Sequence, residues 1–150
     1  MSRRRRVALL DVNVLVALFD PDHVHHDLAH DWFRDDRRHG WATCATTENG
    51  FVRVLANPAY GAVASRPGEL LGSLRRFCSA KEHHFWAEDL SLRDASVFDP
   101  ALIRGHRQVT DIYLLGLAVR MSGRLVTFDR TIPLAGVAGA APDALAVVAP

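Results

Sequence analysis

The chain has 150 residues, of which 49% are hydrophobic and 23% are charged, and its formal net charge is +1 at pH 7. This length suits one domain with a real core but hardly two. The small net charge predicts no strong overall electrostatic field. The apolar stretch after the N-terminal arginines runs only from Val7 to Leu10, too short for a signal peptide or a membrane span. We expect one domain over residues 1–150, with residues 1–6 as a basic tail.

In the first part of the chain, apolar runs alternate with amphipathic stretches. The patterns predict strands at 7–10 and 41–44, and helices at 13–19, 27–38, from 46 or 47 to 57, and 67–78. Cys44 and Cys78 both lie in apolar surroundings, which favours buried thiols in a reducing cytosol over a disulfide framework. These features predict a cytoplasmic protein.

The second part continues the alternation of strands and helices. The patterns predict strands at 84–87, 125–128 and 145–148, a short helix at 90–98, and a buried helix at 111–121 that Thr110 caps. Strands that alternate with helices favour parallel pairing with right-handed crossovers. The expected fold is therefore α/β, with three α/β/α layers around a central, mostly parallel sheet.

Four acidic residues have related positions in this predicted fold. Asp11 and Asp129 each follow an apolar strand, whereas Glu48 and Asp111 lie in the expected first turns of two helices. In an open parallel sheet the carboxyl ends of the strands form the ligand crevice. We therefore expect the four carboxylates to converge on one small site.

A single acid at a strand end or helix start is usually a cap or a solvated turn residue. Four of them together either have strongly shifted pKa values or hold a cation. Because the donors are oxygens only, with no adjacent His or Cys, the expected cation is Mg²⁺ or Mn²⁺. Such an ion suits phosphoryl chemistry.

Four stretches of the sequence resemble the acidic motifs of PIN-domain ribonucleases, most closely the VapC toxins of VapBC toxin–antitoxin pairs. They are Leu9–Leu15, Thr47–Arg53, Thr110–Leu114 and Leu125–Asp129, which follow one another in the family's order. The resemblance covers about residues 7 to 148, and no acid of the four motifs is missing.

The resemblance implies a role for each of these residues. Asp11 and Asp111 would be direct metal ligands, Glu48 would act directly or through water, and Asp129 would position a second metal or the attacking water. Asn13 and Thr110 would be polar support. The implied function is a Mg²⁺- or Mn²⁺-dependent endoribonuclease, the toxin of a type II pair. Its partners would be RNA, a cognate antitoxin and, for a homodimer, a second copy.

Two other functions stay open at this point. An RNA-binding module could keep the fold without catalysis, although the intact acids argue against that interpretation. A phosphohydrolase that works through an aspartyl-phosphate could use Asp11 as its nucleophile. Such enzymes generally need a second Asp two residues later, where this chain has Asn13.

Histidines and arginines near the N-terminus offer further candidates. His23, His25, His26 and His30 could bind zinc, line the crevice and touch RNA, or form a hydrated helix entry. The run Arg3–Arg6 is either a phosphate-binding arm or a solvated tail. Arg53, on the Glu48 helix, is a candidate for the rim of the site.

The first two predicted helices contain many large apolar side chains. It consists of Val14, Leu15, Leu18, Phe19, Leu28, Trp32 and Phe33. If two helices on one sheet face cannot bury them all, an apolar patch stays exposed. In the VapC resemblance this patch would receive the antitoxin, and the alternative is that Trp32 and Phe33 complete the core or a homodimer contact.

Overall fold

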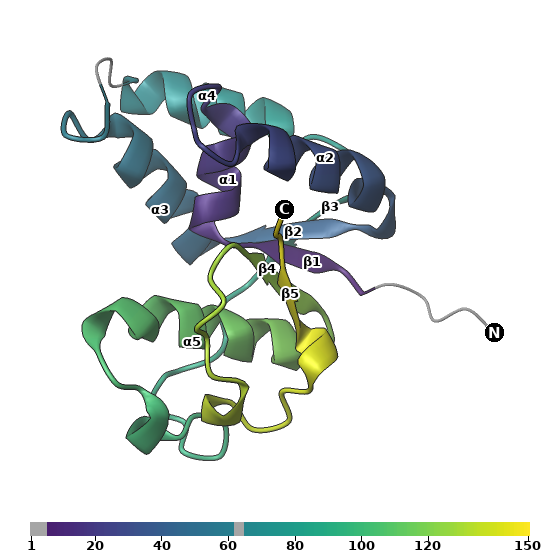
Figure 1. The fold of residues 1–150 in the computed structure, drawn as a ribbon, viewed down its shortest axis with the longest axis vertical. Coiled ribbons are helices and arrows are strands. Elements are labelled where there is room, and N and C mark those ends of the chain that lie inside the picture. The colour runs from purple at the N-terminus through teal and green to yellow at the C-terminus, as the bar shows by residue number, and fades with distance from the viewer. Residues whose placement is uncertain (1–5, 62–64) are drawn as a thin grey trace.

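A central sheet of five parallel strands organises the molecule (Figure 1). The structure is a computed structural model and describes residues 6–61 and 65–150. The strands have the order β3-β2-β1-β4-β5 in the sheet, and their bounds are β1 Ala8–Leu10, β2 Trp41–Cys44, β3 His83–Trp86, β4 Arg124–Thr127 and β5 Leu145–Val147. The expected parallel sheet is confirmed.

Helices cover both faces of this sheet, which confirms the three-layer α/β/α architecture (Figure 1). One face carries α1 (Val12–Phe19), α2 (His26–Asp36), α3 (Ala45–Ala56) and α4 (Pro67–Phe77). The other face carries α5 (His106–Arg120). Four short 3₁₀ helices complete the described elements: Arg37–His39, Pro100–Leu102, Leu134–Gly136 and Pro142–Ala144.

Each face of the sheet has its own hydrophobic core. Under α1 to α4, the fully buried Trp41 and Phe51 pack with the apolar side of α1. Under α5, Leu9 and Leu125 of the central strands pack against Leu115 of that helix. Because both faces are covered, the strands read as continuous apolar runs instead of alternating ones.

The two central strands place the site. β1 pairs with β4 in parallel, with Leu10 opposite Val126, so both strands end at the same edge. Asp11 follows β1 directly and opens α1, and Asp129 comes two residues after the end of β4. The helix that follows β2 comes close to this point, because Gly50 of α3 leaves room for the side chain of Val12.

Helix α5 begins earlier than the sequence predicted. Its N-cap is Gly105 and not Thr110, so Asp111 lies in the second turn instead of the first. The residues from His106 to Gln108 are polar and precede the apolar pattern, so that pattern does not indicate the first turn of the helix. The cap of α3 also differs, because Cys44 is its N-cap and Thr47 forms the reciprocal bond of a capping box.

The short helix expected at 90–98 is wrong. The structure has turns there, in which side chains bond to nearby backbone: Asp94 accepts hydrogen bonds from the backbone N–H and the hydroxyl of Ser96. Such local bonds compete with a helix. The buried Phe98 instead packs against α5 at Gly116, where an added Cβ would lie 2.5 Å from the ring.

The exposed apolar patch expected on the first two helices is also wrong. Val14, Leu15 and Leu18 are buried in the core, and so is Phe33. The other members, Phe19, Leu28 and Trp32, are partly buried and pack against the same core. This face of the sheet therefore buries more of these side chains than two helices alone could cover, because α3 and α4 help to enclose them.

Three remaining expectations concern the tail, the cysteines and the membrane. Residues Arg3 to Arg5 lie outside the described part, while Arg6 is exposed and pairs with Asp143 at 3.4 Å. Both cysteines are free, as expected, although only Cys44 is fully buried and Cys78 is half-buried. Among residues 6–61 and 65–150, no helix is long and apolar enough to cross a membrane.

Candidate active site

Asp11 is fixed at the start of α1 by hydrogen bonds to both of its carboxylate oxygens. Oδ1 accepts from the backbone N–H of Val12 at 2.7 Å, and Oδ2 accepts from the hydroxyl of Thr127 at 2.7 Å. The residue is only 4% exposed. Burial raises the pKa of Asp11, against the opposing effect of these two bonds.

Thr127 connects three polar groups at the end of β4. Its fully buried hydroxyl donates to Asp11 and accepts from the backbone N–H of Asp129 at 3.1 Å and from Nδ2 of Asn13 at 3.3 Å. One hydroxyl thus uses its donor and both of its lone pairs. The predicted support role fits Asn13, whose buried Oδ1 has no hydrogen-bond partner within the described residues.

Asp111 lies beside both other aspartates. Burial raises its pKa to about 7, and the negative charges of Asp11 and Asp129 add to the shift. In contrast, the pKa of Asp129 is lowered, chiefly because the hydroxyl of Thr131 donates to its carboxylate at 2.6 Å. Three of the four predicted carboxylates are therefore brought together by β1, α5 and β4.

A pocket of about 410 Å³ opens onto this group. Its lining consists of Asp11, Val12, Asn13, Val16, His23, Arg53, Val54, Tyr60, Thr110 and Asp111. The acids at the ends of the sheet thus share one pocket with a guanidinium and an imidazole. This placement agrees with the rim position expected for Arg53 and with the expectation that a histidine lines the crevice.

Glu48 does not join the three aspartates. Its carboxylate accepts a hydrogen bond from the hydroxyl of Thr43 at 2.7 Å and lies in a group with Cys78 and His83. Arg53 and Val54, which line the aspartate pocket, are displaced about 120–140° around α3 from Glu48. The sequence correctly placed Glu48 in the first turn of α3 but not the direction of its side chain.

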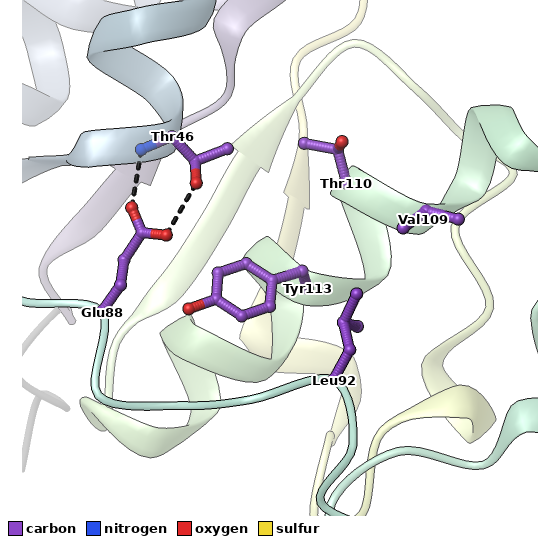
Figure 2. Close-up of a pocket in the computed structure, with 6 residues that line it drawn as sticks. All are labelled: Thr46, Glu88, Leu92, Val109, Thr110 and Tyr113. Atoms are coloured by element: carbon purple, nitrogen blue, oxygen red, sulfur yellow. Dashed lines mark hydrogen bonds between the residues drawn. The ribbon is translucent and has the colours of Figure 1, made fainter.

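A second pocket, of about 320 Å³, adjoins the first. Its lining is Thr46, Glu88, Leu92, Val109, Thr110 and Tyr113 (Figure 2). Thr110 lines both pockets, so its predicted place at the site is supported although it caps no helix. Glu88 accepts from the N–H and the hydroxyl of Thr46, at 2.6 and 2.7 Å.

Sequence reasoning missed Glu88. The signal that could have found it is its position just after β3, where a carboxylate reaches the same edge of the sheet as Asp11. Its two bonds to Thr46 satisfy a free N–H in the first turn of α3, so its visible role is to cap that helix.

The zinc site considered for the N-terminal histidines is wrong. Ring nitrogens of His26 and His30 lie 2.7 and 2.8 Å from the carbonyl oxygens of Ala17 and Leu18. These histidines therefore bind the last turn of α1. His23 and His25 instead pack near the ring of Phe128, and His23 lines the aspartate pocket.

The donors in the aspartate pocket fit a hard divalent cation. Asp11 and Asp111 line the pocket with Asp129 beside them, and the carbonyl oxygen of Asn13 is buried without a partner within the described residues. All of these donors are oxygens. A cation would also favour the ionised form of Asp111, which burial disfavours.

Comparisons with known proteins agree with this arrangement. The family model described as "PIN domain" matches residues 8–138. Ribonuclease VapC44 of Mycobacterium tuberculosis is 45% identical over 141 residues, which cover 94% of this chain and 99% of that protein. Ribonuclease VapC39 of the same organism is 43% identical, over 88% of this chain and 95% of that protein. Ribonuclease VapC38 is 48% identical, with shares of 82% and 85%. The chain therefore belongs to the PIN-domain family and is a ribonuclease of the VapC type.

Proposed function

We propose that this protein is a Mg²⁺- or Mn²⁺-dependent endoribonuclease that hydrolyses RNA phosphodiester bonds. The observation that supports it most is the group of three aspartates, Asp11, Asp111 and Asp129, at the carboxyl ends of β1 and β4. Three adjacent carboxylates, one of them buried, are costly in an apoprotein unless they serve a cation. The relatives named ribonucleases give the reaction class.

Asp11 and Asp111 would hold the metal, and Asp129 would support it. When bound, a divalent cation supplies Lewis acidity and lowers the pKa of water, which makes hydroxide available near neutral pH. Asp11 contributes rigidity, because Val12 and Thr127 hold its two oxygens. Asp111 would give up its proton to the solvent on cation binding, and its carboxylate would then be free to hold the cation.

Two other side chains that line the pocket can bind the substrate. Arg53 offers a fork of N–H donors to a phosphate oxygen, and His23 offers an imidazole in the same pocket. In the hydrolysis, the water oxygen forms a bond to phosphorus while one P–O ester bond breaks. The attacking water loses one proton to the solvent, and the leaving oxygen takes up one proton from the solvent.

A cleavage assay on labelled single-stranded RNA tests this function. We expect cleavage with Mg²⁺ or Mn²⁺, no cleavage with chelator, and a loss of at least about a hundredfold in Asp111→Asn, since even outer partners of a metal site contribute 10–100-fold. Asp31→Asn is the matched control, because Asp31 is exposed on α2 and, within residues 6–61 and 65–150, forms an ion pair only with Arg34. RNA binding without cleavage would favour the binding-module alternative, and turnover of a small phosphomonoester would favour the phosphohydrolase.

We further propose that the protein acts as a toxin, forms a homodimer and is inhibited by a cognate antitoxin. The VapC names of its relatives support this part of the proposal. The side chains first considered for antitoxin docking are buried or partly buried in the core, so the proposal no longer rests on them. Co-purification with the product of an adjacent short gene, followed by light scattering, tests the partner and the copy number. A monomer that the partner does not inhibit would contradict both.

A further inference from the structure

We propose that Glu48, Cys78 and His83 form a zinc site that is separate from the three aspartates. One carboxylate oxygen, the thiol sulfur and one imidazole nitrogen lie within 4.8 Å of one another. They come from three elements: the first turn of α3, the residue that ends α4, and the first residue of β3.

The geometry needs little adjustment to hold an ion. Tetrahedral zinc with bonds of about 2.0–2.3 Å places its ligand atoms about 3.5 Å apart, so these three atoms must close by about 1 Å. All three residues are partly buried, which leaves their side chains some freedom to move. Glu48 also lines a pocket of about 420 Å³ between α3 and α4, through which an ion can enter.

A buried hydroxyl orients two of the three ligands. Thr43 is fully buried on β2 and donates its one hydrogen to Glu48 at 2.7 Å, so Nε2 of His83, at 2.8 Å, must donate to it. A ring that carries its proton on Nε2 would bind zinc through Nδ1. The carboxylate and the imidazole are thus held around the same point. Orienting partners of this kind are typical of built metal sites.

The ligand types select zinc over the cation proposed for the catalytic pocket. Mg²⁺ and Mn²⁺ prefer oxygen donors, whereas a thiolate with an imidazole and one carboxylate suits Zn²⁺. Binding would displace the thiol proton of Cys78 to the solvent and leave a sulfur–zinc bond. Three protein ligands leave a fourth position for water.

The site would act as a clip in the fold. None of its three ligands is among the residues that line the aspartate pocket. Zinc would instead join the start of α3 to the end of α4 and to the edge strand β3, across the connection of residues 57–66. It would therefore reduce the freedom of an edge of the sheet without contributing to the hydrolysis.

Cobalt substitution tests the site directly, because Co²⁺ bound to a thiolate shows a near-ultraviolet charge-transfer band that carboxylate-bound Co²⁺ lacks. We expect one equivalent of Co²⁺ to produce this band in the full chain and Zn²⁺ to abolish it. Cys78→Ser should remove the band. His83→Asn should weaken Zn²⁺ binding, measured against a chromophoric chelator, by at least about tenfold.

Two matched variants complete the experiment. Cys44→Ser changes the other thiol, which packs on the opposite face of the sheet, and His84→Asn changes the exposed neighbour of His83. Both should keep the band and the Zn²⁺ affinity. A wild-type chain without the band, a band that persists in Cys78→Ser, or an unchanged affinity in His83→Asn overturns the proposal. Circular dichroism of each variant verifies the fold. Zinc should raise the melting temperature of the proteins that keep both Cys78 and His83, and not that of Cys78→Ser or His83→Asn.

Discussion

The hydroxyl of Thr127 donates a 2.7 Å hydrogen bond to the carboxylate of Asp11, a residue 116 positions earlier in the chain. The bond joins the ends of two neighbouring parallel strands. Because the same hydroxyl also accepts from Asn13 and from the backbone N–H of Asp129, one buried atom sets the relative positions of two of the three aspartates. The arrangement of the aspartates thus depends on a residue that is not itself acidic.

Replacing that hydroxyl should affect both stability and activity. Thr127→Val keeps the shape but leaves a buried carboxylate oxygen and a backbone N–H without their partner, which should cost about 1–3 kcal/mol of unfolding free energy. RNA cleavage should fall about 10–100-fold, as for other orienting partners of metal ligands. Thr127→Ser keeps the hydroxyl and serves as the control. Chemical denaturation and cleavage rates check both parts, and equal rates for the two variants would contradict this role.

The two functions of Asp11 should separate in a pair of substitutions. Asp11→Asn keeps a side-chain oxygen for the N–H of Val12, whereas Asp11→Ala removes the N-cap of α1. We expect both to lose RNA cleavage, but only Asp11→Ala to lose about 1 kcal/mol of stability through the missing cap. Thermal unfolding in chelator measures this difference. If the two variants melt alike, capping by Asp11 contributes nothing.

The raised pKa of Asp111 predicts how the metal-free protein responds to pH. With a pKa of about 7 in the folded state and 3.8 as the reference, the folded protein holds a proton that the unfolded chain has lost between these values. Stability should therefore fall as pH rises from about 4 to 7, since the unfolded state binds fewer protons there. Asp111→Asn should be more stable than wild type above pH 7, with the advantage disappearing near pH 4. A constant difference across this range would contradict the shift.

Metal binding should be linked to the same proton. Below about pH 7 a cation must displace the proton of Asp111, so calorimetry should detect proton release in buffers of different ionisation enthalpy. The concentration of Mn²⁺ needed for half-maximal cleavage should consequently be higher at pH 6 than at pH 8. Asp111→Asn should release no proton from this group. Metal binding without proton release at pH 6 would count against the assignment.

Trp32 should behave as a structural residue. It packs against the core under α1 to α4, and the guanidinium of Arg124 lies 5.9 Å from its ring centre. Trp32→Ala should lower the unfolding free energy by about 2–3 kcal/mol, less than for a fully buried Trp, because the ring is only partly buried. Urea denaturation checks this value. A variant as stable as wild type would restore Trp32 as a surface residue available to a partner.

The sequence predicted the fold and most of the aspartate site, for a physical reason. Strands buried on both faces appear as continuous apolar runs, and parallel strands bring their carboxyl ends to one edge. Asp11 and Asp129 could be placed by these two facts alone. The position of Asp111 was expected for a partly wrong reason, because the carboxylate reaches the site from the second turn of α5 and not from its cap.

What the sequence could not show depends on side-chain direction and on local competition. A shift of one residue in a helix start turns a side chain by about 100°, and α3 begins at Ala45, so Glu48 faces Thr43 and not Asp11. The turns that replace the helix at 90–98 depend on which side chains bond to the backbone. Neither feature leaves a periodic signal.

The pairing of β1 with β4 has a consequence during protein synthesis. Asp11 leaves the ribosome well before Asp111 and Asp129, which lie 100 and 118 positions later in the chain. Until then β1 lacks its neighbour β4, and Asp11 lacks the hydroxyl that holds it. A nascent or prematurely terminated chain therefore carries Asp11 without its two partners, and we expect such a chain not to cleave RNA.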